Sequence, residues 1–148
     1  MRHLTKPIFF VILLPFVASL PSSRAEEPRA AIRAILDEQV AAWNRGDIEG
    51  FMRGYAQSEA TTFVTGDQLA RGWETVLARY RRVYDSREKM GQLTFSELEI
   101  VPLCGDATLV HGRWELKRAH DTPHGRFTLI FRRLREGWRI VYDHTSAV

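Results

Sequence analysis

The C-terminal segment GWRIVYDHTSA carries the side chains best suited to chemistry. In this segment Tyr142, His144 and Ser146 alternate with their neighbours. Successive residues of a strand point to opposite faces, so these three side chains share a face with the apolar Trp138 and Ile140. Histidine titrates near neutral pH and can act as a general base. The pattern therefore predicts that His144 and Ser146 end a buried apolar row, and His144 is the candidate catalytic residue.

Two interpretations of His144 are open. As a general base it would remove a proton while Tyr55 or Tyr80 donates a hydrogen bond to the developing oxyanion. Alternatively, it hydrogen-bonds a helix side chain such as Gln39 and only satisfies a polar gap in the core. Ligand contact without chemistry is compatible with both. A serine hydrolase is poorly supported, because Ser146 lacks a nucleophile elbow.

The residues expected to line a ligand pocket are aromatic or polar and fall on the inward faces of predicted helices and strands. They are Gln39, Trp43, Tyr55, Tyr80, Trp114, Tyr142, His144 and Ser146. Most of the aromatic ones also suit a plain small core. No acidic residue falls on the predicted inner strand face, because Asp143 and Glu115 have the opposite parity. This composition favours binding of a small, mostly apolar molecule over carboxylate catalysis.

Metal and cofactor chemistry find little support. His120 and His124 have a chelating spacing, but Thr122 and Pro123 make this segment a loop, and no Cys or Glu completes a ligand set. Cys104 is the only cysteine, so it cannot form an intrachain disulfide, and we interpret it as a small residue at a strand end. The sequence predicts no metal and no cofactor.

Helices precede strands along the chain. Apolar spacing predicts a first helix over 28–43, a short second helix capped by Asp47, and a third helix starting at Trp73. A small hairpin turns at Gly66 and Asp67 between the second and third helices. The charged SREKMG then leads into four strands, the last three of them a meander from 106 to 146. This order indicates an α+β domain, with three N-terminal helices packed on a curved antiparallel sheet.

The third helix also carries Arg79, Arg81 and Arg82 on one flank. Such a row is either a solvated face or an anion site, and the sequence leaves both interpretations open.

The N-terminus has the composition of a secretory leader. Basic residues precede an apolar run from Pro7 to Leu20, and small residues follow at Ser23 and Ala25. We therefore expect residues 1–25 to be a signal peptide and 26–148 a single domain, periplasmic or secreted and without a membrane anchor after cleavage. The chain has 21 basic and 18 acidic residues, and the leader holds three basic residues and no acid. The mature chain is then formally neutral, which disfavours nucleic-acid binding.

Four segments together resemble the nuclear-transport-factor-2-like superfamily, nearest its SnoaL-like and calcium/calmodulin-dependent-kinase association-domain-like branch. They are AAWNRGDIEGFMRGYA, RGW, GRW and GWRIVYDHTSA. The resemblance covers nearly all of residues 28–147. It implies a cone-shaped α+β roll with a pocket at its open end, usually assembled as a homodimer through the sheet. The superfamily that the chain resembles includes ketosteroid isomerase and polyketide cyclases, together with many members without known activity.

Three functions follow as hypotheses. The first is a secreted small-molecule-binding domain with an apolar pocket. The second is a cofactor-free lyase, isomerase or polyketide-cyclase-type enzyme with His144 as base. The third is a structural dimerisation module whose pocket is filled by its own side chains. The sequence does not decide whether the protein is an enzyme.

Overall fold

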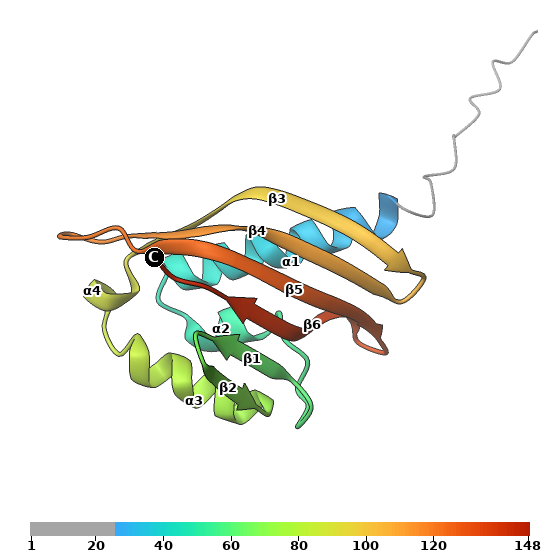
Figure 1. Ribbon diagram of the computed structural model, residues 1–148, viewed down its shortest axis with the longest axis horizontal. Helices are drawn as coiled ribbons and strands as arrows, with labels where there is room; N and C mark the ends of the chain where they lie inside the picture. The colour runs from blue at the N-terminus through green and yellow to red at the C-terminus, as the bar shows by residue number, and fades with distance from the viewer. Residues whose placement is uncertain (1–25) are drawn as a thin grey trace, which may run out of the picture.

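The computed structural model describes residues 26–148, so the predicted leader at 1–25 lies outside the described residues. Within that range the chain forms four helices and one six-stranded sheet. Figure 1 shows α1 running along the sheet behind β3 to β5, with α3 beside β1 and β2. The predicted α+β roll, with helices on a curved sheet, is confirmed. In the described part of the chain no helix combines the length and apolar character needed to cross a bilayer.

Helix α1 spans Glu26–Asn44, slightly more than the predicted 28–43. Its buried face includes Ile32, Leu36 and Trp43, which recur at helical spacing. The chain leaves the helix through Gly46, whose φ of +86° lies in the region that favours glycine. Helix α1 thus presents one apolar stripe to the sheet, as its sequence pattern predicts.

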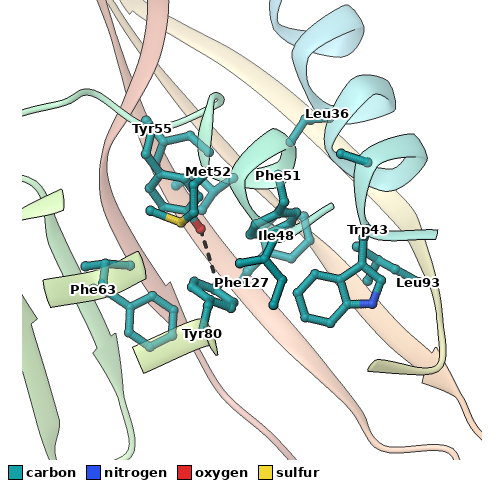
Figure 2. Packing of buried hydrophobic residues seen from close by; sticks show 14 of the residues in the cluster. Leu36, Trp43, Ile48, Phe51, Met52, Tyr55, Phe63, Tyr80, Leu93 and Phe127 are labelled. Carbon is teal, nitrogen blue, oxygen red and sulfur yellow. Dashed lines mark hydrogen bonds between the residues drawn. The ribbon is translucent and has the colours of Figure 1, made fainter. Parts of the chain in front are cut away.

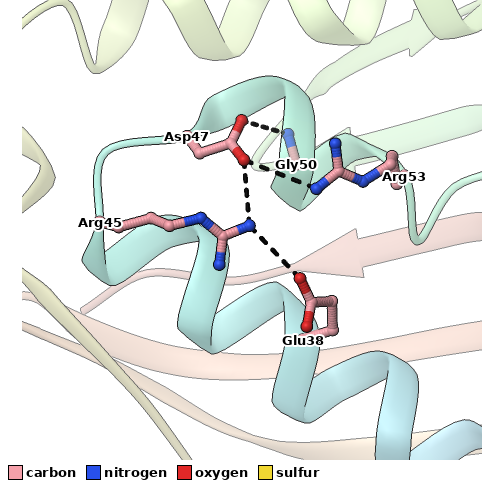
Figure 3. Close-up of polar contacts among 5 residues, drawn as sticks. All are labelled: Glu38, Arg45, Asp47, Gly50 and Arg53. Atoms are coloured by element: carbon pink, nitrogen blue, oxygen red, sulfur yellow. Dashed lines mark hydrogen bonds and ion pairs between the residues drawn. The ribbon is translucent and has the colours of Figure 1, made fainter.

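Helix α2 (Ile48–Met52) begins at Asp47, and the predicted capping role of this residue is confirmed. Its Oδ1 accepts a hydrogen bond from the Gly50 N–H at 2.6 Å. Its Oδ2 lies 3.0 Å from Arg45 Nη2 and 3.6 Å from Arg53 Nη2 (Figure 3). The Gly50 N–H is the main reason why the pKa of Asp47 lies below its usual value, and the arginines lower it further. Asp47 is therefore a structural carboxylate at a helix end.

Helix α3 (Trp73–Val83) buries Val76, Leu77 and Tyr80. The charged segment that follows contains a short helix that the sequence pattern did not predict, α4 (Arg87–Met90). The Ser86 side chain caps it by accepting a hydrogen bond from the Lys89 N–H at 3.3 Å. Helix α4 returns the chain to the sheet close to the end of α1.

The six strands are β1 (Thr62–Thr65), β2 (Gln68–Arg71), β3 (Gln92–Cys104), β4 (Ala107–Lys117), β5 (His124–Leu134) and β6 (Gly137–Thr145). They pair in the order β2-β1-β6-β5-β4-β3. The predicted hairpin and the predicted three-stranded antiparallel meander are both present, and β3 pairs antiparallel with β4 beside that meander. The hairpin joins the sheet through β1, which runs parallel to β6. The sheet is therefore open, with β2 and β3 as its two edges.

A one-residue bulge in β6 changes which side chains face the helices. Phe131 of β5 pairs with Ile140 of β6, but its neighbour Ile130 pairs with Tyr142. Val141 is therefore an extra residue in β6 without a partner in β5. Asp143 beyond the bulge is 3% exposed. The predicted inward parity of Tyr142, His144 and Ser146 was therefore wrong.

The bulge lies where β6 changes its neighbour. The Ile140 N–H donates to the Gly54 carbonyl at 2.8 Å, and the Ile140 carbonyl accepts from the Ala56 N–H at 2.9 Å. Further along, Tyr142 pairs with Thr62 of β1. Two different segments thus flank the same edge of β6, and the extra residue accommodates both.

Aromatic side chains fill the space between the helices and the sheet (Figure 2). Trp43 makes edge-to-face contacts with Phe51 and Tyr84, at ring-centroid distances of 5.2 and 4.7 Å. Asn44 fastens the end of α1 to β3, because its side chain donates to the Leu93 carbonyl at 3.0 Å and accepts from the Leu93 N–H at 2.7 Å. These contacts fix the helices over the inner face of the sheet.

Candidate functional site

A cavity of about 190 Å³ lies between the helices and the inner face of the sheet. The strands contribute Trp114, Leu116, Phe127 and Leu129 to its wall. The helices contribute Trp43, Phe51 and Tyr80, and Tyr84 directly follows the end of α3. At its outer end are the half-buried Arg79 and Thr65 and the exposed Ala147. The lining is thus mainly aromatic and aliphatic, with few polar groups, which is the usual composition of a small-molecule site.

Asp143 is the carboxyl group of this cavity. Its Oδ2 accepts a hydrogen bond from Tyr55 Oη at 2.6 Å, and its Oδ1 accepts one from Thr145 Oγ1 at 2.7 Å. Burial raises its pKa to about 6, because desolvation disfavours the charged form. The two hydrogen bonds and the charges of His144 and Arg79 act in the opposite direction. Asp143 therefore changes its protonation state close to neutral pH.

Two phenols extend the polar end of the cavity. The hydroxyls of Tyr55 and Tyr80 lie 3.4 Å apart, and Tyr55 also donates to Asp143 (Figure 2 shows the two tyrosines). Burial raises the pKa of both tyrosines well above the usual value, so both stay neutral. With the Tyr55 proton engaged by Asp143, the Tyr80 hydroxyl can donate to Tyr55 or to a bound molecule.

Three further polar side chains of the lining, Gln39, Trp43 and Trp114, are hydrogen-bonded within the protein. Gln39 is 2% exposed and its Nε2 donates to the Phe51 carbonyl at 3.1 Å. Trp43 Nε1 donates to the Met90 carbonyl at 3.0 Å, and Trp114 Nε1 donates to the Ser146 carbonyl at 2.8 Å. Both indole N–H groups are thus occupied, so the two tryptophans offer apolar surface to the cavity.

Residues 32–148, most of the chain, match the family model of the SnoaL-like domain. The chain belongs to the SnoaL-like domain family. The predicted resemblance to the nuclear-transport-factor-2-like superfamily is thereby confirmed.

Solved structures agree with this assignment. An NTF-2-like protein of unknown function from Shewanella oneidensis MR-1 is 40% identical to the SnoaL-like domain described here, with a TM-score of 0.77 over 80% of this chain and 98% of that one. A ketosteroid isomerase-like protein from Erwinia carotovora atroseptica SCRI1043 is 20% identical, with a TM-score of 0.65 over 80% of this chain and 95% of that one. At that identity the second likeness shows the fold alone. A search of the curated proteins found no match.

The SnoaL-like domain brings together five of the eight residues predicted to bind a ligand. Gln39, Trp43, Tyr55, Tyr80 and Trp114 all line the cavity. Gln39 lines the cavity, and its side-chain amide donates to the Phe51 carbonyl.

The other three predicted residues lie outside the cavity. Tyr142 is half-buried on the outer sheet face, and His144 and Ser146 are exposed. Ser146 hydrogen-bonds the backbone of Arg126 across the strand pair instead. The cause is the extra residue Val141, which reverses the parity of everything after it. The proposed contact of His144 with Gln39 was wrong for the same reason.

The polar lining residues that the sequence pattern did not place in the pocket include Asp143, Thr145 and Arg79. Asp143 was assigned to the outer face together with Thr145. Arg79 was recognised only as part of a basic helix flank. Only a weak signal in the sequence pointed to Asp143 and Thr145, namely the apolar Val141 in the same row, whereas Trp138 and Ile140 favoured the other row.

Within residues 26–148, no group of three or more His, Cys, Asp or Glu side chains is arranged to hold a metal ion. His124 instead contacts the Thr122 carbonyl through Nδ1 at 3.0 Å. The ionisable groups that line the cavity are one carboxyl group, three phenols (Tyr55, Tyr80 and Tyr84) and one guanidinium.

Proposed function

We propose that the protein binds a small, mostly apolar molecule in this cavity, with a polar group of that molecule held by Asp143 and Tyr80. The observation that carries the proposal is a carboxyl group, 3% exposed, that lines an otherwise largely apolar cavity. Burying a carboxylate is costly, and groups with such shifted pKa values concentrate at functional sites. We also propose, from the leader-like composition of residues 1–25, that the mature protein is periplasmic or secreted.

A second candidate is proton transfer, with Asp143 in the role that the sequence pattern gave to His144. A base with a pKa of about 6 is close to the value that general catalysis favours at neutral pH. Its carboxylate would take the proton from a carbon next to a carbonyl group. The electron pair of that C–H bond would form a C=C bond to the carbonyl carbon, and the π electron pair of the C=O bond would move to the oxygen. The Tyr80 hydroxyl would donate a hydrogen bond to this enolate oxygen. In a ketone with a C=C bond one carbon further on, return of the proton to the far carbon of that bond would complete an isomerisation.

The third hypothesis, a structural module whose pocket is filled by its own side chains, is the weakest of the three. A space of about 190 Å³ remains between the side chains that line the cavity. A cavity slightly smaller than this, at about 150 Å³, can hold benzene. The available volume therefore supports ligand binding over self-filling.

The test is a comparison of three variants of residues 26–148 by native mass spectrometry and by NMR titration with benzyl alcohol. Asp143→Asn and Tyr80→Phe change the polar end with almost no change in shape, and His144→Ala serves as the matched control on the same strand. We expect the first two to weaken binding several-fold and the control to bind like the wild type. Equal binding by all variants, or no binding by the wild type, would remove the proposal.

Catalysis is tested separately from binding. A ketone ligand found by mass spectrometry is incubated in D₂O with each variant, and its C–H signals are followed by NMR. Exchange that disappears in Asp143→Asn and persists in His144→Ala would establish Asp143 as the base. Exchange that depends on His144 would instead restore the hypothesis drawn from the sequence.

A further inference from the structure

Arg79 lies at the outer end of the cavity and is half-buried. The carbon at the centre of its guanidinium lies 4.8 Å from the ring centroid of Phe63, a cation–π contact that holds the group against the cavity wall. Its positive charge lowers the pKa of Asp143, Tyr80 and Tyr84, although burial outweighs this effect at all three. The charge of Arg79 thus acts inside the cavity.

The three arginines of the α3 flank have different surroundings. Arg81 points away from the cavity and forms an ion pair with Glu49 of α2. Arg79 and Arg82 both line a shallow groove between α3 and the β1–β2 hairpin, which adjoins the cavity at Phe63. Among residues 26–148, no carboxylate lies within ion-pair distance of Arg79. Arg79 therefore presents a partly desolvated positive charge to the outer end of the cavity.

We infer that the ligand is a small carboxylate, whose apolar body fills the cavity and whose carboxylate binds Arg79, with Arg82 adding positive potential over the groove. This inference rests on the proposed function. A planar guanidinium matches a carboxylate in two parallel hydrogen bonds. Given that about 150 Å³ suffices for benzene, a cavity of about 190 Å³ accommodates a body of one ring.

The inner end of the cavity constrains the same ligand. Above its pKa of about 6, most Asp143 side chains are ionised, and the carboxylate repels a second negative charge. The end of the ligand that faces Asp143 and Tyr80 must therefore be neutral, such as a hydroxyl or a carbonyl group. Asp143 and Arg79 both line the cavity, so an anionic ligand is oriented with its carboxylate towards Arg79 and its neutral polar group towards Asp143.

The test uses three probes that share one aromatic ring: phenylacetate, benzyl alcohol and 2-phenylethylamine. Each is titrated into residues 26–148 at pH 7.5 and low salt, and the dissociation constant is measured by NMR. We expect phenylacetate to bind at least about tenfold more tightly than benzyl alcohol, as one charge-assisted hydrogen-bonded pair allows. Raising the salt concentration to 200 mM should reduce that advantage, because the outer end of the cavity is accessible to ions.

Variants then assign the advantage to one side chain. Arg79→Gln should abolish the preference for phenylacetate over benzyl alcohol, whereas Arg81→Gln, on the same helix, should retain this preference. Arg79→Lys keeps the positive charge and should retain part of the preference for phenylacetate. It therefore tests the charge of residue 79 even if the glutamine variant does not fold.

The outcomes separate the two proposals. Equal binding of phenylacetate and benzyl alcohol, or a preference that survives in Arg79→Gln, overturns the carboxylate inference and leaves the binding function standing. Tighter binding of 2-phenylethylamine overturns it as well, because Asp143 would then select the charge. A cavity that takes none of the three probes overturns both.

Discussion

Replacing Asp143 by asparagine should stabilise the protein at neutral pH although it alters the centre of the site. In the folded state the pKa of Asp143 is raised from 3.8 to about 6, chiefly by burial. This difference corresponds to about 3 kcal/mol between the two protonation states. The folded state therefore carries a cost of that order whenever Asp143 is ionised.

The sign follows from proton binding. Between pH 3.8 and about 6 the folded state holds the Asp143 proton more tightly than the unfolded state does. The contribution of Asp143 to the free energy of unfolding is thus fully present below pH 3.8 and is lost as the pH rises through about 6. An asparagine has no such dependence, and its amide can accept from Thr145 and donate to Tyr55, which can then donate to Tyr80. Neutral hydrogen bonds are weaker than those to a carboxylate by about 1 kcal/mol, which offsets part of the gain.

The assay is urea denaturation of wild type and Asp143→Asn at pH 4 and pH 7.5. The difference in unfolding free energy between the two proteins should shift by about 2 kcal/mol in favour of asparagine from the lower to the higher pH. Other carboxylates titrate in both proteins and cancel in this difference. Asp106→Asn is the control, because its exposed carboxylate has a lowered pKa, chiefly through the Cys104 thiol, and its pH dependence has the opposite sign. A difference that does not change with pH would refute the raised pKa of Asp143.

Three further predictions concern other parts of the molecule. Asn44→Ala removes both hydrogen bonds to the Leu93 backbone and should cost about 1–3 kcal/mol of unfolding free energy, measured by urea denaturation; an unchanged midpoint would show that this clamp contributes nothing. His144→Ala alters an exposed side chain and should leave the melting temperature within about 1 °C of the wild type, since exposed substitutions change stability little; a large decrease would indicate a buried role. The homodimer predicted from sequence remains a proposal: the outer sheet face carries the half-buried Leu109, Ile130 and Tyr142, so light scattering should give a dimer mass for the wild type and a monomer mass for Ile130→Arg, and a monomeric wild type would contradict it.

Local patterns were sufficient for most of the fold. The heptad-like spacing of Ile32, Leu36 and Trp43 predicts the buried face of α1, and Asp47 predicts the start of α2. Alternation likewise identifies the inward rows of β4 and β5, because Val110 and Phe127 face the core in an unbroken register. These features depend on residues close together in the chain, so they can be predicted from the sequence.

The site was harder to predict because one residue of β6 decides it. The bulge at Val141 exists where the 54–56 segment and β1 meet the same strand edge, more than 75 residues earlier in the chain. No local preference of the sequence IVYDH marks this position, and both rows of the strand contain an apolar residue. Helical spacing placed Tyr80 correctly, and Tyr55 lies just beyond the end of α2, in a bridge to Ile140. Their partner Asp143 could not be placed from local spacing, because its orientation depends on this long-range contact.

The bulge also has a consequence for the order of folding events. The hairpin of β5 and β6 is local and forms early, whereas the 54–56 segment must close a long loop before it can reach Ile140. Until then the hairpin is free to pair without a bulge, with Tyr142 and His144 on the inner face. A deletion of Val141 would make β6 regular while keeping Asp143 inward. We therefore expect a smaller fraction of slowly refolding molecules for the deletion variant than for the wild type, in which β6 can pair with β5 in two registers.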